Sequence, residues 1–202
     1  LISVLQRFYP VESGKILVNG TNWQKIDIPQ WRNKIAMVEQ HVKLFNGTIL
    51  ENICLEENLN IEKVVDFCKE TGIDTFINEF QQGYATIINE NSANLSGGQQ
   101  QLIALARALY QKPQVLLLDE ATAAMDRRTE QFVLNLLQRL KSKMIVIFVT
   151  HRVQLARRTD KIIVIENKQV SASGTHEQVV KLNRLYAETF EEILTEKREF
   201  NQ

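Results

Sequence analysis

LSGGQ at residues 95–99, followed later in the chain by VLLLDE at residues 115–120, decides the fold that this sequence predicts. The glycine pair predicts the start of a helix, where Ser96 and unobstructed backbone N–H groups favour an anion such as phosphate. The apolar run of the second stretch predicts a buried strand, and an acidic pair emerges at its end. Asp119 offers a carboxylate to a divalent cation, and Glu120 offers one that can orient water. The two stretches together predict a phosphate-binding site in an α/β protein.

Apolar periodicity on both sides of these stretches predicts alternating strands and helices. Residues 145–149 are apolar, as a parallel strand covered on both faces is, and residues 162–165 resemble them. The helix between the strands carries apolar residues at helical spacing from Phe132 to Leu140. A further helix runs from the glycine pair to a point just before Pro113. The predicted class is therefore α/β, with a mainly parallel core sheet.

The chain divides into three predicted regions, 1–40, 41–113 and 114–202. The first holds a short helix, a strand closed by Asn19-Gly20, and a second strand with Gln40 at its end. The second is mainly helical, with one helix between an Asn60 cap and a Gly72 stop, and an irregular stretch before the glycine pair. The third alternates strand and helix and forms the catalytic core.

Polar residues follow the predicted strands at their carboxyl ends, where ligands gather in parallel sheets. Gln40 follows one strand, and its amide oxygen can reach a metal ion or the attacking water. His151 follows another strand, and it can donate a hydrogen bond to a γ-phosphate oxygen. The alternative for Asp119 and Glu120 is a simple cap on the following helix. The glycine motif upstream and His151 downstream favour catalysis instead.

Composition excludes several classes of protein. The 202 residues carry 24 basic and 24 acidic side chains, so no net field favours nucleic acid. The apolar runs are too short to cross a bilayer, which takes about 20 residues. Cys54 and Cys68 lack metal-site spacing and are expected to be buried, reduced thiols. Ser13-Gly14-Lys15 is not a phosphate loop, because Ile16 and Tyr9 break the GxxxxGK[ST] pattern; we expect a turn into a strand.

In this order, the motifs resemble the ATP-binding cassette of ABC transporters over nearly the whole chain. The signature resembles residues 95–99, and the Walker B segment resembles Val115–Asp119 with Glu120. Residues 121–126 resemble the D-loop, Gln40 the Q-loop glutamine, and His151 the switch histidine. Residues 44–53, 87–94 and 174–177 resemble the exporter branch, most closely peptide exporters, including the peptidase-containing bacteriocin type. Lipid and multidrug exporters follow closely.

The resemblance implies a P-loop NTPase fold with an inserted α-helical subdomain, and it implies ATP and Mg²⁺ as cofactors. In that family two cassettes meet head to tail, so that each signature contacts the nucleotide of the partner. The implied roles are as follows: Leu95, Ser96, Gly97, Gly98 and Gln99 bind the partner's ATP, Gln40 and Asp119 hold the metal, Glu120 and His151 are catalytic, and Asp126 belongs to the D-loop. Gln100, Leu102 and Ala123 depart from the usual pattern, but none of them removes a catalytic group.

The implied partners are a second cassette, expected in a homodimer, and the transmembrane domains of the same transporter, with no nucleic acid. The implied location is the cytoplasmic face of a membrane, expected to be the bacterial inner membrane. Leu1–Arg7 resembles the remainder of the helix that a Walker A loop caps, so the chain is expected to be a fragment, inactive alone. Two alternatives stay open: a soluble ATPase of this family without a transporter, and a degenerate binding or scaffold protein.

Overall fold

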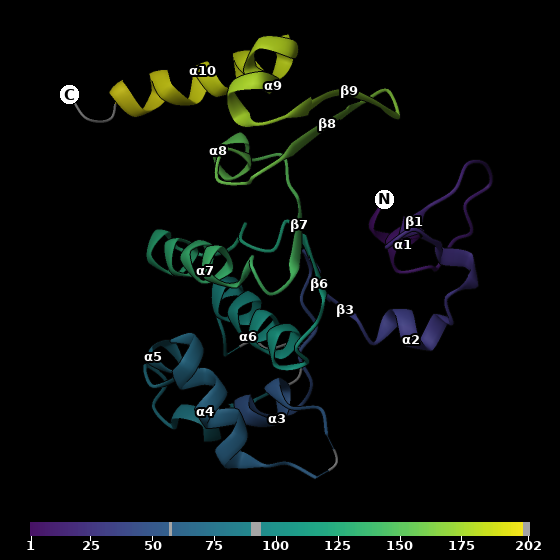
Figure 1. The fold of residues 1–202 in the computed structure, drawn as a ribbon. Helices are drawn as coiled ribbons and strands as arrows, with labels where there is room; N and C mark the ends of the chain where they lie inside the picture. The colour runs from purple at the N-terminus through teal and green to yellow at the C-terminus, as the bar shows by residue number, and fades with distance from the viewer. Residues whose placement is uncertain (57, 90–93, 200–202) are drawn as a thin grey trace. The chain divides into compact units, whose positions relative to one another are not determined.

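The computed structural model describes residues 1–56, 58–89 and 94–199, with side chains described up to residue 191. Residues 90–93 of the segment expected to be irregular therefore lie outside the described residues. The chain forms two compact units, Leu1–Val149 and Thr150–Gln202. Each unit is described by itself below (Figure 1).

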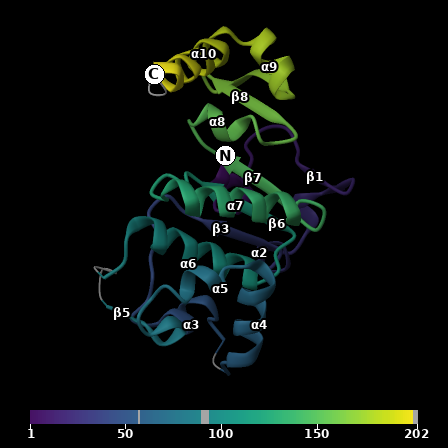
Figure 2. The same cartoon turned by 90° about the vertical axis from the view of Figure 1, so that its left-hand side faces the viewer.

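The centre of the first unit is a three-stranded sheet with the order β3-β6-β7. Its strands are β3 (Ile35–Val38), β6 (Val115–Asp119) and β7 (Ile145–Val149). Both neighbouring pairs are parallel, with Val38 opposite Leu118 and Asp119 opposite Val149. Helices α6 (Gly97–Tyr110) and α7 (Arg127–Leu140) lie on one face of this sheet in both views (Figures 1 and 2). The predicted parallel α/β core is confirmed.

The three strands differ in how far they are covered. The three central leucines of β6 are almost fully buried, because this strand lies between the other two. Ile145 of β7 is 62% exposed and the rest of that strand is half-buried. The prediction that β7 is covered on both faces is therefore wrong for the described part of the chain. Unlike β6, this strand has a neighbour on one side only within the sheet.

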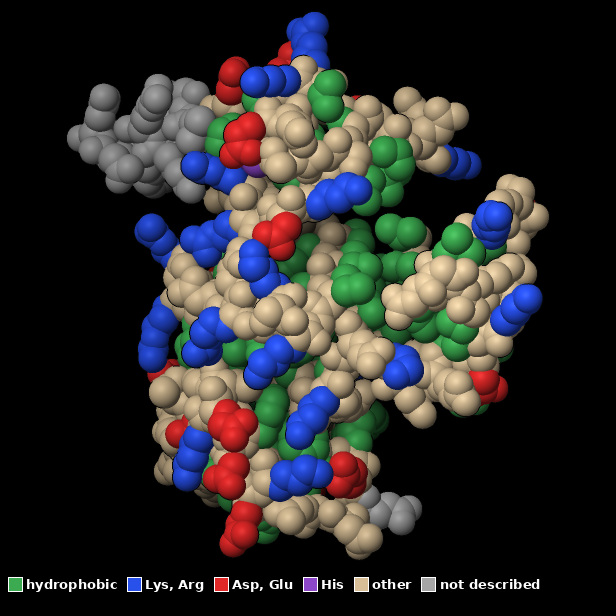
Figure 3. Space-filling view, in the orientation of Figure 1, with side chains coloured by type: hydrophobic (Ala, Val, Ile, Leu, Met, Phe, Trp, Pro, Cys, Tyr) green, Lys and Arg blue, Asp and Glu red, His purple; other side chains and the backbone are tan. Residues whose placement is uncertain are grey.

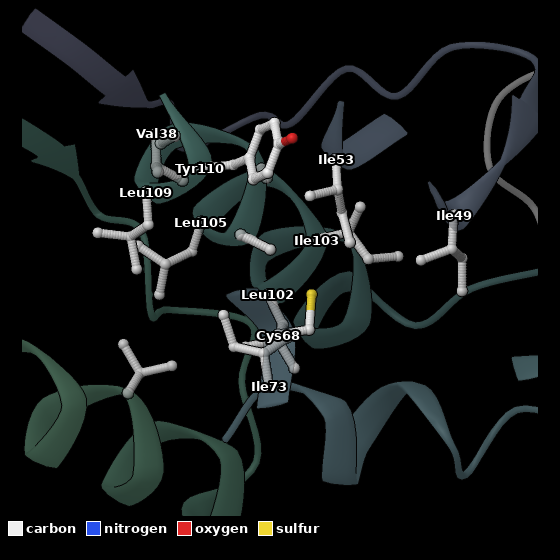
Figure 4. Packing of buried hydrophobic residues seen from close by; sticks show 14 of the residues in the cluster. Val38, Ile49, Ile53, Cys68, Ile73, Leu102, Ile103, Leu105, Leu109 and Tyr110 are labelled. Atoms are coloured by element: carbon white, nitrogen blue, oxygen red, sulfur yellow. The ribbon is translucent and has the colours of Figure 1, made fainter. Parts of the chain in front are cut away.

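The helical part of the first unit forms around a shared apolar core. Helix α4 (Ile61–Thr71) begins where the Asn60 side chain accepts a hydrogen bond from the Lys63 backbone, and it ends at Gly72, which is left-handed. Helices α3 (Ile49–Ile53) and α5 (Asp74–Ile77) flank it. Figure 4 shows side chains of α6 packed among residues of β3, α3 and α4. Cys54 and Cys68 are buried free thiols, as predicted.

The amino-terminal segment is built from short elements. They are α1 (Ile2–Leu5), β1 (Leu17–Val18), β2 (Thr21–Asn22), η1 (Trp23–Lys25) and α2 (Ile28–Arg32). Further along the chain, β4 (Gly47–Thr48) pairs with β5 (Ile87–Ile88). The short helix η2 (Gly83–Ala85) precedes β5. Asn19 and Gly20 both have positive φ and close the β1–β2 hairpin. Gly14 is followed by this hairpin and not by a helix, so the prediction of a turn into a strand is confirmed.

The second unit is a hairpin covered by helices. It contains α8 (Val153–Ala156), β8 (Ile162–Glu166), β9 (Gln169–Gly174), α9 (His176–Leu182) and α10 (Arg184–Glu199). Strand β8 pairs with β9 in antiparallel fashion, and Ile163 and Ile165 are more than half exposed. The expectation that residues 162–165 form a parallel strand like the others is therefore wrong. Asn167 and Lys168, both at positive φ, turn the chain straight back into β9.

Two further properties of the described residues are the apolar character of the helices and the distribution of surface charge. In the described part of the chain, no helix has both the length and the apolar character that a membrane span requires. On the face drawn in Figure 3, basic and acidic side chains are interspersed. This mixture agrees with the zero net charge of the sequence.

Candidate nucleotide-binding and catalytic site

The LSGGQ stretch forms the capped start of α6. Ser96 is the N-cap, and its hydroxyl oxygen accepts a hydrogen bond from the Gln99 backbone at 3.2 Å. The Gln99 side chain returns the bond by accepting from the Ser96 backbone at 2.9 Å, which completes a capping box. Ser96 and Gln99 are exposed, whereas Leu95 is buried as an anchor. The capped turn holds an exposed hydroxyl, which carries its own proton to donate, at the positive end of a fourteen-residue helix.

Gly97 and Gly98 serve a packing role that the sequence alone did not reveal. A Cβ atom on Gly97 would lie 2.9 Å from the Ala124 methyl carbon. One on Gly98 would lie 2.9 Å from the Ala124 carbonyl oxygen and 3.0 Å from the Met125 Cα. Only glycine allows the start of α6 to approach the loop 121–126 this closely. The predicted phosphate-facing turn is thus packed against the loop that follows the acidic pair.

Gln101 is a residue that sequence reasoning missed. It is only 3% exposed, and its amide oxygen accepts a hydrogen bond from the Ala124 backbone at 3.1 Å. Its amide nitrogen donates to the Glu120 carbonyl oxygen at 3.4 Å. No signal in the sequence separates it from Gln99 and Gln100, which also have apolar residues three and four positions on.

The acidic pair lies where β6 ends. Asp119 is the last residue of the strand and is half-buried. Glu120 has φ 48°, and its backbone N–H donates to the Val149 carbonyl at 3.0 Å. A left-handed backbone is uncommon for a residue other than glycine and is found where surrounding structure holds it. The main chain therefore turns sharply after the strand, and the neighbouring strand β7 helps to place the turn.

Gln40 lies at the same end of the sheet. It is exposed and follows β3, whose Val38 stands opposite Leu118 of β6. Gln40 and Asp119 thus extend from neighbouring parallel strands and offer oxygen donors of the kind that Mg²⁺ prefers. The described residues contain no cluster of three or more His, Cys, Asp or Glu side chains arranged for a metal. Two protein oxygens fit an ion that takes its other ligands from phosphates and water.

Asp126, and not the acidic pair, caps the helix that follows. Its carboxylate accepts hydrogen bonds from the backbones of Arg128, at 2.8 Å, and Thr129, at 3.0 Å, and from the Thr129 hydroxyl at 2.8 Å. The bonds from Thr129 above all hold the pKa of Asp126 below its usual value. The simple capping role considered for Asp119 and Glu120 therefore belongs to Asp126.

His151 lies in the second unit, two positions after the end of β7. It is exposed, and the Thr150 hydroxyl beside it accepts a hydrogen bond from the Arg152 backbone at 3.0 Å. The structure brings Gln40, Asp119 and Glu120 to one end of the sheet in the first unit. The place of His151 relative to these three residues stays a prediction.

A buried polar network presents Phe45 on the surface. Asn52 is 1% exposed; its side-chain oxygen accepts from the Phe45 backbone at 2.8 Å, and its amide nitrogen donates to the Phe45 carbonyl at 2.9 Å. The Arg107 guanidinium donates to Asn52 and lies over the Phe45 ring, 4.9 Å from its centre. Burial lowers the pKa of Arg107. The network fixes an exposed aromatic ring just before α3.

A cavity of about 100 Å³ lies beside the signature, between α5, α6 and the start of α7. Ser96, Gln99 and Asp126 line it together with apolar residues such as Phe76 and Phe80. Gln40, Asp119 and Glu120 do not line it. The cavity is therefore separate from the end of the sheet where these three residues lie.

The fold and these motifs define an ATP-binding cassette, and comparison with known proteins agrees. Residues 1–123 match the family described as ABC transporter, so the chain belongs to the ABC transporter family. The structure resembles that of a bacterial Atm1-family ABC exporter with ATP bound, with a TM-score of 0.85 and 33% identity. The match covers 95% of this chain and 34% of that one. The predicted P-loop NTPase fold of an ABC ATPase is confirmed.

The similar curated proteins include a toxin translocation protein, a lipid flippase and a plant ABC transporter. The chain is 39% identical over 190 residues to the leukotoxin translocation ATP-binding protein LktB of Mannheimia glucosida, covering 93% of this chain and 27% of that protein. It is 36% identical over 192 residues to the ATP-dependent lipid A-core flippase of Haemophilus influenzae, covering 94% and 33%. It is 38% identical over 188 residues to ABC transporter B family member 13 of Arabidopsis thaliana, covering 93% and 15%. The chain thus spans 15% to 33% of the length of these relatives. The resemblance to the exporter branch is confirmed, and these relatives do not single out the peptidase-containing type.

Proposed function

We propose that this chain is the ATP-hydrolysing cassette of an ABC exporter, working in a head-to-tail pair. The observation that carries the proposal is the packing of the capped LSGGQ turn against the loop that follows Asp119 and Glu120. One cassette thereby holds both a phosphate-facing helix start and a hydrolytic carboxylate on one rigid support. The proposal includes three regions: residues 1–40, which end at Gln40; the mainly helical residues 41–113, which carry the signature; and the catalytic core, residues 114–202.

The two faces of the cassette serve two nucleotides. Ser96 and the start of the signature helix, with Gly97, Gly98 and Gln99, bind the phosphates of the partner's ATP, since both the helix dipole and the hydroxyl favour an anion. Gln40 and Asp119 hold Mg²⁺, which neutralises phosphate charge when bound. Glu120 orients the attacking water for the nucleotide of its own cassette, and His151 donates a hydrogen bond to the γ-phosphate.

ATP closes the pair because it contacts both cassettes at once, and hydrolysis removes the contact that distinguishes the closed from the open state. The exposed Phe45 ring and the neighbouring Gln40 segment transmit closure to transmembrane domains. This role agrees with a surface aromatic fixed by a buried network, because a rigid contact transmits displacement better than a mobile one. The transported substrate is a peptide, a lipid or a drug, and the cassette lies on the cytoplasmic face of the membrane, in bacteria the inner membrane.

The decisive test is Glu120→Gln in the full-length transporter that this proposal implies. Turnover of ATP is expected to fall roughly 10²–10⁴-fold, as for other positioned acids and bases, while ATP binding persists. Glu166→Gln is the matched control, because Glu166 also ends an apolar strand but accepts a hydrogen bond from Asn183 at 2.6 Å. Equal turnover in the Glu120→Gln variant and the wild type would remove Glu120 from its role.

A second test concerns the 202-residue polypeptide alone. It contains no GxxxxGK[ST] sequence to cradle the β- and γ-phosphates, so we expect very little ATPase activity and weak binding of ATP. Isothermal calorimetry of this polypeptide with ATP measures the affinity. Saturable binding in the micromolar range would contradict the expectation.

A further inference from the structure

We infer that Gln101 is a positioning residue that ties the signature helix to the hydrolytic site, so that each cassette links the two ATP sites of the pair. The inference rests on the proposed function and deepens it. Gln101 touches neither nucleotide in this arrangement; it acts through the backbone of the loop that begins at Glu120.

The contacts of Gln101 join two segments that are far apart in the sequence. Its side chain is buried and bonds on one side to the Ala124 N–H, at 3.1 Å, and on the other to the Glu120 carbonyl, at 3.4 Å. A primary amide supplies a donor and an acceptor from one planar group, which a hydrophobic side chain of equal length does not. Gln101 therefore satisfies both ends of the loop turn with one rigid group.

The loop has its own reason to need such a support. Glu120 has φ 48°, and its carbonyl also accepts a hydrogen bond from the Ala123 backbone at 3.0 Å. A left-handed residue other than glycine is strained and persists only where the surrounding structure holds it. The backbone N–H of Glu120 donates a hydrogen bond to the Val149 carbonyl, and the backbone carbonyl of Glu120 accepts one from the Gln101 side chain. The direction of the Glu120 side chain follows from this backbone.

The other end of the connection is the signature itself. Ser96 caps the helix on which Gln101 lies, little more than one turn away, and Gly97 and Gly98 bring that turn into contact with Ala124 and Met125. A shift of Ser96 toward a phosphate therefore moves the amide of Gln101 and the loop bonded to it. Ser96 faces the partner's ATP and Glu120 faces the cassette's own ATP, so Gln101 couples occupancy of one site to geometry at the other.

The experiment uses the full-length transporter with Gln101→Met, which keeps the length of the side chain and removes both hydrogen bonds. The maximal rate of ATP hydrolysis is expected to fall roughly 10- to 100-fold, the range for a misplaced catalytic group, while KM for ATP changes little. Gln111→Met is the control, because Gln111 is the exposed C-cap of the same helix. Hydrogen exchange of the Ala124 amide in nucleotide-free protein is measured in parallel and is expected to accelerate.

Gln101→Glu supplies a rescue that a merely structural role would not produce. A protonated carboxyl both donates and accepts, as the amide does, and burial favours the protonated form. The ratio of variant to wild-type turnover is therefore expected to rise as the pH falls from 8 to 6. If Gln101→Met does not fold, the pH dependence of Gln101→Glu still tests whether Gln101 positions the loop that begins at Glu120.

The outcomes separate the inference from the proposed function. A wild-type rate in Gln101→Met, an unchanged Ala124 exchange rate, or a ratio for Gln101→Glu that is constant with pH would overturn the inference. A wild-type transporter that hydrolyses no ATP would overturn the proposed function, and the Ala124 exchange rate would still decide whether Gln101 positions the loop.

Discussion

Strands β6 and β8 have nearly the same pattern of residues and different structural fates. VLLLD at residues 115–119 and IIVIE at residues 162–166 each place four apolar residues before a carboxylate. Strand β6 is the buried centre of a parallel sheet, whereas β8 is half of an antiparallel hairpin with every second side chain facing outward. An apolar run thus predicts a strand without predicting its neighbours.

The difference arises after each strand. Beyond β6, the loop 121–126 packs on the start of α6, and the Asp126 cap then begins α7, which carries the chain across to the parallel strand β7. Beyond β8, Asn167 and Lys168 reverse the chain at once. The carboxylates differ accordingly. Asp119 is followed by the sharply turned Glu120, while Glu166 bonds to Asn183 of the same unit.

The largest expected effect is a difference in unfolding free energy between truncating a side chain of β6 and truncating one of β8. Leu116→Ala removes a side chain with 0% exposure and is expected to cost about 2–5 kcal/mol of unfolding free energy, since the cavity cannot fully close. Ile163→Ala, at a position 55% exposed, is expected to cost about 1 kcal/mol or less. Denaturant unfolding followed by circular dichroism measures both. Equal losses would mean that the two strands are buried alike.

The next effect tests the loop after β6. Gly98→Ala drives a methyl group against backbone atoms of Ala124 and Met125 and is expected to cost about 1–3 kcal/mol. Gly97→Ala meets only the Ala124 methyl group. Adding Ala124→Gly should therefore restore the thermal midpoint of Gly97→Ala and leave that of Gly98→Ala low. If Ala124→Gly restored the thermal midpoint of both variants, the backbone of the loop would not be packed rigidly against α6.

A smaller effect tests the turn after β8. Lys168 has φ 65°, so Lys168→Gly is expected to stabilise the hairpin by about 1 kcal/mol or less. The β1–β2 hairpin already has glycine at this place, with Gly20 at φ 79°, and Gly20→Lys is expected to destabilise it by a similar amount. Amide exchange within the two hairpins measures these changes. No gain from Lys168→Gly would argue against a turn that needs positive φ there.

The smallest effect concerns the cap that begins the crossover from β6 to β7. The pKa of Asp126 is lowered by hydrogen bonds from Thr129 and Arg128, so the capping contribution is present above the ordinary pKa of 3.8 and is lost as the pH falls through the lowered value. Asp126→Asn is expected to keep a cap and lose this acid dependence. Thermal unfolding between neutral pH and about pH 3 measures the difference. Parallel pH curves for both proteins would exclude an ionised cap.

Much of the local structure was predicted from residues that act through their own backbone. The Asn60 cap and Gly72 stop of α4 and the glycine pair at the start of α6 were predicted at their correct positions, since caps and glycine turns act over a few residues. The parallel pairing of β6 with β7 was predicted from their apolar runs together with the helix between them. The antiparallel pairing of β8 did not, because a two-residue turn with Lys at positive φ lacks the usual glycine signal.

The sequence by itself determined the class of protein and the order of its motifs, and it predicts which residues have phosphate, metal and proton chemistry. These depend on residue type and short spacing, which a linear chain displays directly. Only the tertiary structure decided that Gly97 and Gly98 are packing residues and that Gln101 supports the backbone of Glu120. The reason is physical: close backbone approach and buried amide bonds join segments distant in sequence, and they exist only once the chain has folded.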